Sequence, residues 1–376
     1  MKEPITESKT ATKTESELQR QKWQPIEYVG LVLLIVILAC VFFFDKEFSG
    51  MFDAMFTRAY KMFEFYLFGA SKLGAAIVVS VMTGRVLERL GLTDALMRLF
   101  LPVMKLIKVN AAVVVGVIYN ILGDVNAAGR IAGPVVMKAG CTKDEQKIAI
   151  ATMCNAPCSF SIIVLGIIAL SAAGINPLPV MIVGIFLPIV LVPALLKLFW
   201  RNTKAADIKD LPRFTPNTSA MDTLFGSARE GAQLVFLFIL PAGCVVFALI
   251  GIMEYFGIWP VVTDVLGGFF SMIGIEPMTG VDTIMTAGTL AMKNLGTYLT
   301  DGTIIATTAA VKKLIVGSFI LANSAWPIQV PLGQIPAVWN GVVDLKNGEI
   351  MRAALIGCFL RLVYAAVVAQ IFGLFF

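Results

Sequence analysis

The chain has 376 residues, of which 58% are hydrophobic and 15% are charged. Soluble domains contain ~45–50% apolar and ~25% charged residues, so this composition predicts a polytopic membrane protein. The sequence has no histidine, which excludes Ser-His-Asp and Cys-His catalysis and His-ligated metal sites. We therefore expect no enzyme, and the modest net charge of +5 gives no reason to expect nucleic-acid binding.

The six cysteines lie mostly inside or beside apolar stretches, at spacings that give no disulfide framework. Cys154 and Cys158 share a helical face, which would suit a soft metal ion. Packing of small side chains inside a helix is the interpretation that we favour. We therefore predict neither a resident metal nor a cofactor.

The chain divides into five segments. Residues 1–24 are polar, which predicts a disordered cytoplasmic tail. An anchor helix and its connector are expected within 25–60, because the apolar run there starts too late for a signal peptide and lacks a cleavage site. A first repeat at 61–200, a basic cytoplasmic linker at 201–228 and a second repeat at 229–376 follow.

The two repeats are inferred from an internal similarity. Residues 86–92 resemble 252–258, and the offset of 166 still holds where 108–110 faces 274–276. Beyond residue 110 the register drifts. A tandem duplication explains the shared order of features, with chance similarity as the alternative.

Charge predicts how the two copies are oriented. The amphipathic segment 85–108 carries several Lys and Arg, whereas its counterpart 251–276 carries none. Because Lys and Arg are enriched on the cytoplasmic side, the two segments should face opposite sides of the membrane. This is typical of the inverted repeats of secondary transporters, although drift in charge would give the same asymmetry.

One re-entrant hairpin is predicted in each repeat. The glycine-rich segment 123–130 interrupts the apolar stretch 111–139, leaving legs of roughly 19 Å that are too short to span the bilayer. The second hairpin is expected at 277–303, with its tip near 289–296 and including Lys293 and Asn294. Spans are expected at 145–172, 176–199, 231–251, 308–343 and 350–375.

Polar residues at membrane depth are functional candidates because they are costly to bury in lipid. Asn120 and Asp124 share one helical face, and Asn126 and Arg130 share another. The flexible backbone at Gly123 could present amide groups to a ligand. The alternative is an Asp124–Arg130 ion pair that only stabilises the hairpin.

A second set of candidates lies where prolines interrupt two predicted spans. Asn155 precedes Pro157, and Asn323 precedes Pro327 at the corresponding place in the second half. Proline disfavours helix at the preceding residue, so both helices should break at mid-membrane and line a cavity. Paired interruptions indicate a solute site, with two independent proline kinks as the alternative.

The stretch from Asn120 through 129–134 to 155–157 resembles the nucleoside-recognition or Gate domain proteins, which include spore maturation proteins. Related segments occur in concentrative nucleoside transporters and in the membrane part of the ferrous-iron transporter. The resemblance implies two re-entrant hairpins that each precede a broken helix, with tips that hold nucleoside and sodium. It implies binding by Gly123, Asp124, Asn126, Asn155 and Ser159, and by Asn294, Asn323, Ser324 and Gln329 from the second half.

The sequence therefore predicts an all-α, polytopic membrane protein, an inverted repeat with re-entrant helical hairpins and broken transmembrane helices. We expect a homo-oligomeric secondary transporter of a bacterial inner membrane, with a cytoplasmic N-terminus. It would move a small polar solute, with sodium or protons as the coupling ion. A non-transporting envelope or sporulation partner and a metal-ion permease remain alternatives. The expected site comprises Asn120, Gly123, Asp124, Asn126, Asn155, Ser159, Lys293, Asn294, Asn323, Ser324 and Gln329.

Overall fold

The computed structural model describes residues 23–64, 67, 73–205, 213 and 215–376. Every regular element in this part of the chain is a helix, which confirms the predicted all-α class. The chain divides into two compact units, one ending at Asp53 and the other running from Ala54 to Phe376. Nearly all of the predicted tail at 1–24 lies outside the described residues.

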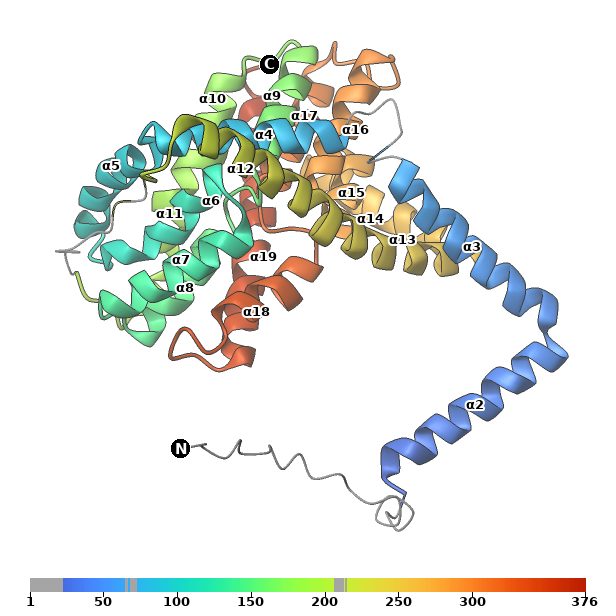
Figure 1. Ribbon diagram of the computed structural model, residues 1–376. Helices are drawn as coiled ribbons and strands as arrows, with labels where there is room; N and C mark the ends of the chain where they lie inside the picture. The colour runs from blue at the N-terminus through green and yellow to red at the C-terminus, as the bar shows by residue number, and fades with distance from the viewer. Residues whose placement is uncertain (1–22, 65–66, 68–72, 206–212, 214) are drawn as a thin grey trace, which may run out of the picture. The chain divides into compact units, whose positions relative to one another are not determined.

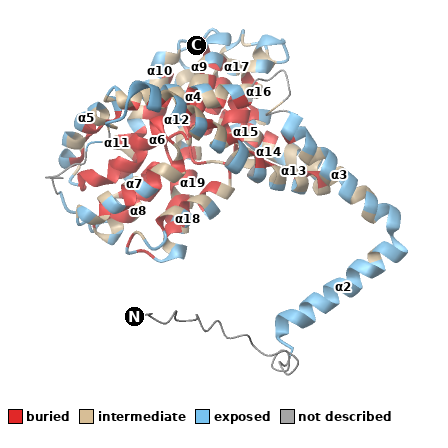
Figure 2. Ribbon diagram, viewed as in Figure 1, coloured by how far each residue is buried: buried red, intermediate tan, exposed pale blue. Residues whose placement is uncertain are grey.

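The first unit holds helix α2 (Pro25–Phe43) and the start of α3 (Asp45–Phe63). Gln24 and Glu27 form a capping box at the start of α2, and Pro25 occupies its first turn. The helix is strongly apolar and exposed along its whole length (Figure 2). Its 19 residues extend about 28 Å, which is sufficient to cross a bilayer.

The second unit contains two series of helices in the same order (Figure 1). The first series is α4 (Leu73–Arg89), α5 (Leu92–Leu106), η2 (Ala111–Val114), α6 (Val115–Leu122), α7 (Val125–Lys138), α8 (Lys143–Met153), α9 (Phe160–Ala172), α10 (Pro177–Met181), η3 (Ile182–Phe186) and α11 (Leu187–Leu196). The second is α12 (Ala220–Gln233), η4 (Leu234–Ile239), α13 (Leu240–Tyr255), α14 (Ile258–Ile273), α15 (Pro277–Met285), α16 (Gly288–Thr300), α17 (Ala309–Ala322), η5 (Val330–Gln334), α18 (Ile335–Trp339) and α19 (Asn347–Gly373).

Corresponding glycines mark the same bend in both series. Gly91 joins α4 to α5 with φ 86°, and Gly257 joins α13 to α14 with φ 68°. These left-handed conformations favour glycine because it has no Cβ. The second bend turns the chain by 108°. The predicted similarity at offset 166 thus coincides with a shared structural feature.

Helix N-caps extend the same register further than the residue similarity indicated. Asn110 caps η2, and Glu276, 166 residues later, caps α15. Thr142 and Thr308 cap α8 and α17 at the same offset. The offset of 166 therefore holds at both ends of the hairpin segment, while the two breaks depart from it, since Asn155 and Asn323 lie 168 residues apart.

Both re-entrant hairpins are present, but the tip of the second was predicted wrongly. The first turns at residues 123–124, between α6 and α7, and the second at 286–287, between α15 and α16. The expected tip segment 289–296 instead forms most of helix α16. Gly288 is the glycine that matters for the turn, since a Cβ there would lie 2.5 Å from the Ala322 carbonyl oxygen. Gly296 has open space around it.

The predicted helix breaks are also present. Helices α8 and α9 are separated by residues 154–159, and α17 and η5 by 323–329. Among the described residues, three helical stretches are long and apolar enough to cross a membrane, namely α2, Pro177–Leu196 and α19. The bent pair Gly243–Tyr255 and Ile258–Ile273 makes a fourth if it forms one span. Buried residues gather in α6, α8 and α19 (Figure 2), so the hairpins and breaks lie within the packed interior of the second unit. The chain is a multi-pass membrane protein.

Candidate functional site

A cavity of about 100 Å³ lies where both hairpin turns and both helix breaks meet. It is smaller than the ~300–1,000 Å³ of typical ligand pockets, so the described conformation encloses a small volume. Its polar lining comes from all four segments, while η4 and Met62 supply apolar walls. The polar residues of the lining are Asp124, Asn126, Ser159, Thr286, Thr289, Trp326, Gln329 and Gln334.

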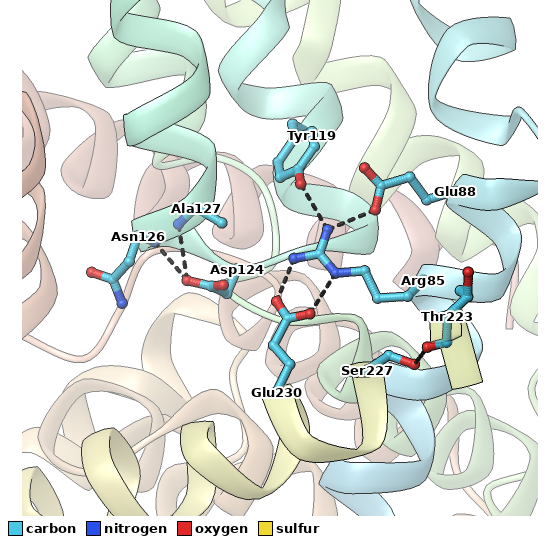
Figure 3. Close-up of polar contacts among 9 residues, drawn as sticks. All are labelled: Arg85, Glu88, Tyr119, Asp124, Asn126, Ala127, Thr223, Ser227 and Glu230. Atoms are coloured by element: carbon cyan, nitrogen blue, oxygen red, sulfur yellow. Dashed lines mark hydrogen bonds and ion pairs between the residues drawn. The ribbon is translucent and has the colours of Figure 1, made fainter. Parts of the chain in front are cut away.

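The first hairpin is tied to the first break. Asp124 Oδ1 accepts hydrogen bonds from the backbone N–H groups of Asn126 (2.8 Å) and Ala127 (3.1 Å) and so caps α7 (Figure 3). Asp124 also forms an antiparallel backbone bridge with Ser159, whose hydroxyl caps α9. Two helix N-termini, which carry partial positive charge, are thus held at the cavity.

The second hairpin is tied to the second break in a different way. The Ile328 N–H donates to the Ile284 carbonyl at 3.0 Å, and Gln329 Nε2 donates to the Thr286 carbonyl at 3.4 Å. Helix α16 begins at Gly288 without a side-chain cap. Gln329 Oε1 has no partner among the described residues, so an acceptor is left at the cavity wall.

The two breaks repeat one local structure. Asn155 Nδ2 donates to the Ala151 carbonyl at 2.9 Å, and Asn323 Nδ2 donates to the Phe319 carbonyl at 2.7 Å. Each asparagine side chain therefore binds the carbonyl four residues earlier, in the last turn of the helix that ends before the break. In both cases Oδ1 has no partner within the described part of the chain. This common arrangement favours a duplicated break over two independent proline kinks.

Thiols contribute to the contact between the breaks. Cys158 Sγ donates to the Ser324 carbonyl at 3.2 Å, and Cys358 Sγ donates to the Ala325 carbonyl at 3.7 Å. The Ala325 N–H in turn donates to the Cys154 carbonyl at 3.0 Å. Among the described residues, no group of three or more Cys, Asp or Glu side chains is arranged to hold a metal ion.

The structure brings only some of the expected site residues to the cavity. Asp124, Asn126, Ser159 and Gln329 line it, and Gly123 forms the adjacent turn. The others lie elsewhere. Asn155 binds carbonyls of α8 and α19, and Asn323 and Ser324 bind carbonyls of α17. Asn120 is fully buried on α6, Asn294 binds Asp282 at 2.8 Å, and Lys293 lies on α16.

Asn294 lies away from the cavity because the hairpin turns earlier than expected. Its partner Asp282 lies on α15, and both side chains line a separate cavity that also includes Arg58 and Tyr298. The Asp124–Arg130 ion pair considered as an alternative is not formed, because Asp124 instead caps its own helix. Arg130 lines a neighbouring cavity.

A chain of cavities leads away from the hairpin turns along α12. A cavity of about 400 Å³ shares Asp124 and Asn126 with the central one and is also lined by Glu230. A further cavity of about 530 Å³ shares Glu230 and extends past Arg85 to Arg213 in the basic linker. The structure thus outlines a polar path from the hairpin tip to the linker side.

A cluster of polar side chains around Arg85, which we call the Arg85 cluster, lies across this path (Figure 3). Arg85 of α4 binds both carboxylate oxygens of Glu230 on α12, with its Nε 2.8 Å from Oε2. Its Nη1 lies 2.6 Å from Glu88 and 2.7 Å from the hydroxyl of Tyr119, which belongs to the first hairpin. Arg85 therefore connects three elements. Composition and spacing gave no indication of this cluster.

No protein-family model matches the chain, and no curated protein matches it. Among solved structures, the chain is similar to CNTnw in an inward-facing substrate-bound state, with a TM-score of 0.56, 16% identity and coverage of 92% of this chain and 83% of that one. A CNTnw variant in an outward-facing state and another in an intermediate state each give a TM-score of 0.57 at 16% identity, covering 93% of this chain and 86% and 85% of theirs. The chain has the fold of a concentrative nucleoside transporter.

One residue central to the breaks was not among the predicted site residues. Arg361, near the middle of α19, is fully buried and donates to carbonyls on both broken helices. A signal for it does exist, because a charged residue within the apolar stretch 350–375 is costly in a membrane.

Proposed function

We propose that this protein is a secondary transporter that moves a small polar solute across a bacterial inner membrane. The observation that carries the proposal is the cavity at which two re-entrant hairpin turns and two broken helices meet. Helix breaks leave backbone N–H and C=O groups without helical partners, which is tolerated at membrane depth where these groups line a cavity. Paired broken helices are typical of transporter sites. The shared fold with concentrative nucleoside transporters supports the same function.

Asp124 is the carboxylate that we propose to link transport to an ion. It lies at the first hairpin turn and lines both the central cavity and the cavity leading to Glu230. Its Oδ1 is committed to capping α7, while no described residue donates to Oδ2. We propose that this oxygen binds the coupling ion, a sodium ion or a proton.

The proposed solute is neutral or zwitterionic, and a nucleoside or a similar small metabolite fits this description. Amide and hydroxyl groups dominate the polar lining, with Asp124 as the charged member among the lining residues. The indole of Trp326 forms part of the wall and could stack on a planar ring. The CNTnw structures are described in inward-facing, outward-facing and intermediate states, and we propose a comparable alternation here.

Further proposals follow from the resemblance and the charge pattern. These are a homo-oligomeric assembly, a cytoplasmic N-terminus, a relation to Gate domain proteins and inverse orientation of the two repeats. In this arrangement the linker side of the cavity chain would face the cytoplasm, because Lys and Arg are enriched there.

Uptake by purified protein in proteoliposomes tests the proposal. Tritiated uridine and a panel of unlabelled nucleosides, bases and amino acids would be offered under an inward sodium gradient, a proton gradient or no gradient. We expect saturable, gradient-dependent uptake of at least one solute, together with thermal stabilisation by the same solute. Thermal stabilisation without uptake under any gradient would instead favour a non-transporting sensor.

A further inference from the structure

Arg361 is an unusual feature of the membrane interior. It lies near the middle of α19, a helix long and apolar enough to span, and its side chain is fully buried. No carboxylate among the described residues lies within ion-pair distance of it. A buried cation without an acid is costly, so its environment must supply compensation of another kind.

Backbone carbonyls on both halves of the repeat supply part of that compensation. Arg361 Nε donates to the Ile320 carbonyl of α17 at 2.8 Å, and Nη1 donates to the Asn155 carbonyl of the first break at 3.1 Å. The Ile320 carbonyl lies in the last turn of α17, where helical partners are lacking, and the Asn155 carbonyl lies in the break after α8. The neighbouring carbonyls of Phe319 and Leu321 in α17 accept from Asn323 and Ser324, so side chains satisfy three consecutive carbonyls in the last turn of this helix.

Helix dipoles add to this compensation, although Arg361 Nη2 has no hydrogen-bond partner among the described residues. Helix α8 ends at Met153 and α17 ends at Ala322, so Arg361 lies at the C-terminal ends of both half-helices. Each such end carries about half a unit of negative charge, so both ends favour a guanidinium placed there. The ring of Tyr364 lies 5.7 Å from the guanidinium carbon and gives a further cation–π contact.

We propose that Arg361 is a positioning residue that couples the two helix breaks, so that they move as one unit when the cavity opens or closes. One planar guanidinium donates to the first break and to the last turn of α17, which leads into the second break, and a point charge cannot do this with the same fixed geometry. The coupling extends to the Cys158–Ser324 contact, which joins the same two breaks at the cavity wall. Loss of the two hydrogen bonds from the Arg361 guanidinium should therefore increase the exposure of Cys158.

Alkylation of native cysteines measures this coupling without any solute. Full-length protein in proteoliposomes would be treated with N-ethylmaleimide, and the rate at each cysteine read by peptide mass spectrometry. Arg361→Gln removes the positive charge, whereas Arg361→Lys keeps the charge but lacks the planar guanidinium that donates to both carbonyls. Cys244 on α13 is the internal control, and Arg352→Gln, on the exposed face of α19, is the matched charge control.

We expect both Arg361 variants to accelerate alkylation of Cys158 by about tenfold, as loss of a hydrogen bond to a charged group predicts. Cys244 should react at the wild-type rate, and Arg352→Gln should change neither site. A wild-type rate at Cys158 in Arg361→Lys would overturn the proposal, because charge alone would then suffice. Equal acceleration at Cys158 and Cys244 would also overturn it, because the effect would be general loosening.

Hydrogen exchange of the unmodified protein keeps the proposal testable if the variants do not fold. Amides of the two breaks, at 154–159 and 323–329, should become exchangeable together and at similar rates. Rates that differ by more than about tenfold would show that the breaks open independently, and would contradict the coupling. Neither measurement requires a transported solute. The coupling by Arg361 and the proposed transport can therefore be contradicted independently of each other.

Discussion

At the scale of single residues, Asp124 has two roles that substitution can separate. Asn is as good a helix cap as Asp, so Asp124→Asn should keep the bonds to the α7 amides while removing the charge. We expect its melting temperature to match the wild type and its gradient-dependent uptake to fall at least about tenfold. Proteoliposome uptake and scanning fluorimetry measure the two effects.

Two controls make the Asp124 result specific. Asp124→Ala loses the cap as well, so it should be destabilised by ~1 kcal/mol in addition to losing uptake. Asp301→Asn changes the same chemistry in the exposed loop after α16 and should transport normally. Undiminished and still gradient-dependent uptake by Asp124→Asn would remove Asp124 from the ion site.

Gly288 allows the second hairpin to approach the second break. The atoms closest to it belong to backbone: a Cβ would lie 2.5 Å from the Ala322 carbonyl oxygen and 3.3 Å from the Ala322 carbonyl carbon. Because backbone cannot yield as a flexible side chain can, we expect Gly288→Ala to destabilise the protein by ~1–3 kcal/mol. Thermal unfolding in detergent measures this.

Gly296 provides the matched control on the same helix. The nearest atom to a Cβ there is Ala169 Cβ at 4.0 Å. Gly296→Ala should therefore leave stability unchanged or raise it by up to ~1 kcal/mol, since alanine favours helix. Equal losses in the two variants would show that the close approach at Gly288 is not what positions the hairpin.

At the scale of elements, the Arg85 cluster fastens α12 to α4 and to the first hairpin. Glu230→Gln replaces a carboxylate that accepts two bonds from Arg85 with an amide that can accept only through its oxygen. The exposed fraction of the Glu230 side chain is 38%, so solvent screens the pair and we expect a loss of only ~1 kcal/mol. Amides of α12 should then exchange faster with deuterated water.

A smaller change tests whether the hairpin belongs to the same cluster. Tyr119→Phe removes the hydroxyl that accepts a hydrogen bond from Arg85 and should cost ~1 kcal/mol. Because the residues share one arginine, the losses in the double variant should not add. Strict additivity, or unchanged exchange of α12 in Glu230→Gln, would show that the elements are held by packing alone.

At the scale of the whole molecule, the repeat and its interruptions could be predicted because they depend on local signals. Glycine at 91 and 257 marks a left-handed bend, and proline after Asn155 and Asn323 ends a helix wherever the chain lies. The short legs around residue 123 follow from length alone. Predicting these features required no knowledge of the tertiary contacts.

The remainder depends on contacts between distant parts of the chain. Both Gly288 and Gly296 could form a turn by sequence, and the approach to Ala322 distinguishes them. Arg361 reaches carbonyls 41 and 206 residues away, and Arg85 reaches Glu230 across 145 residues. Contacts between residues so far apart leave no pattern in the sequence. These contacts could therefore be identified only from the structure.

A solute that binds between the hairpin turns and the breaks must contact the cavity wall that includes Cys158. The most direct measurement is the rate of Cys158 alkylation by N-ethylmaleimide with and without a solute that supports uptake, with Cys244 as the control. We predict that the solute slows alkylation of Cys158 at concentrations near its KM and leaves Cys244 unchanged. Saturable uptake with an unchanged rate at Cys158 would contradict binding at this cavity, because the solute would then pass elsewhere.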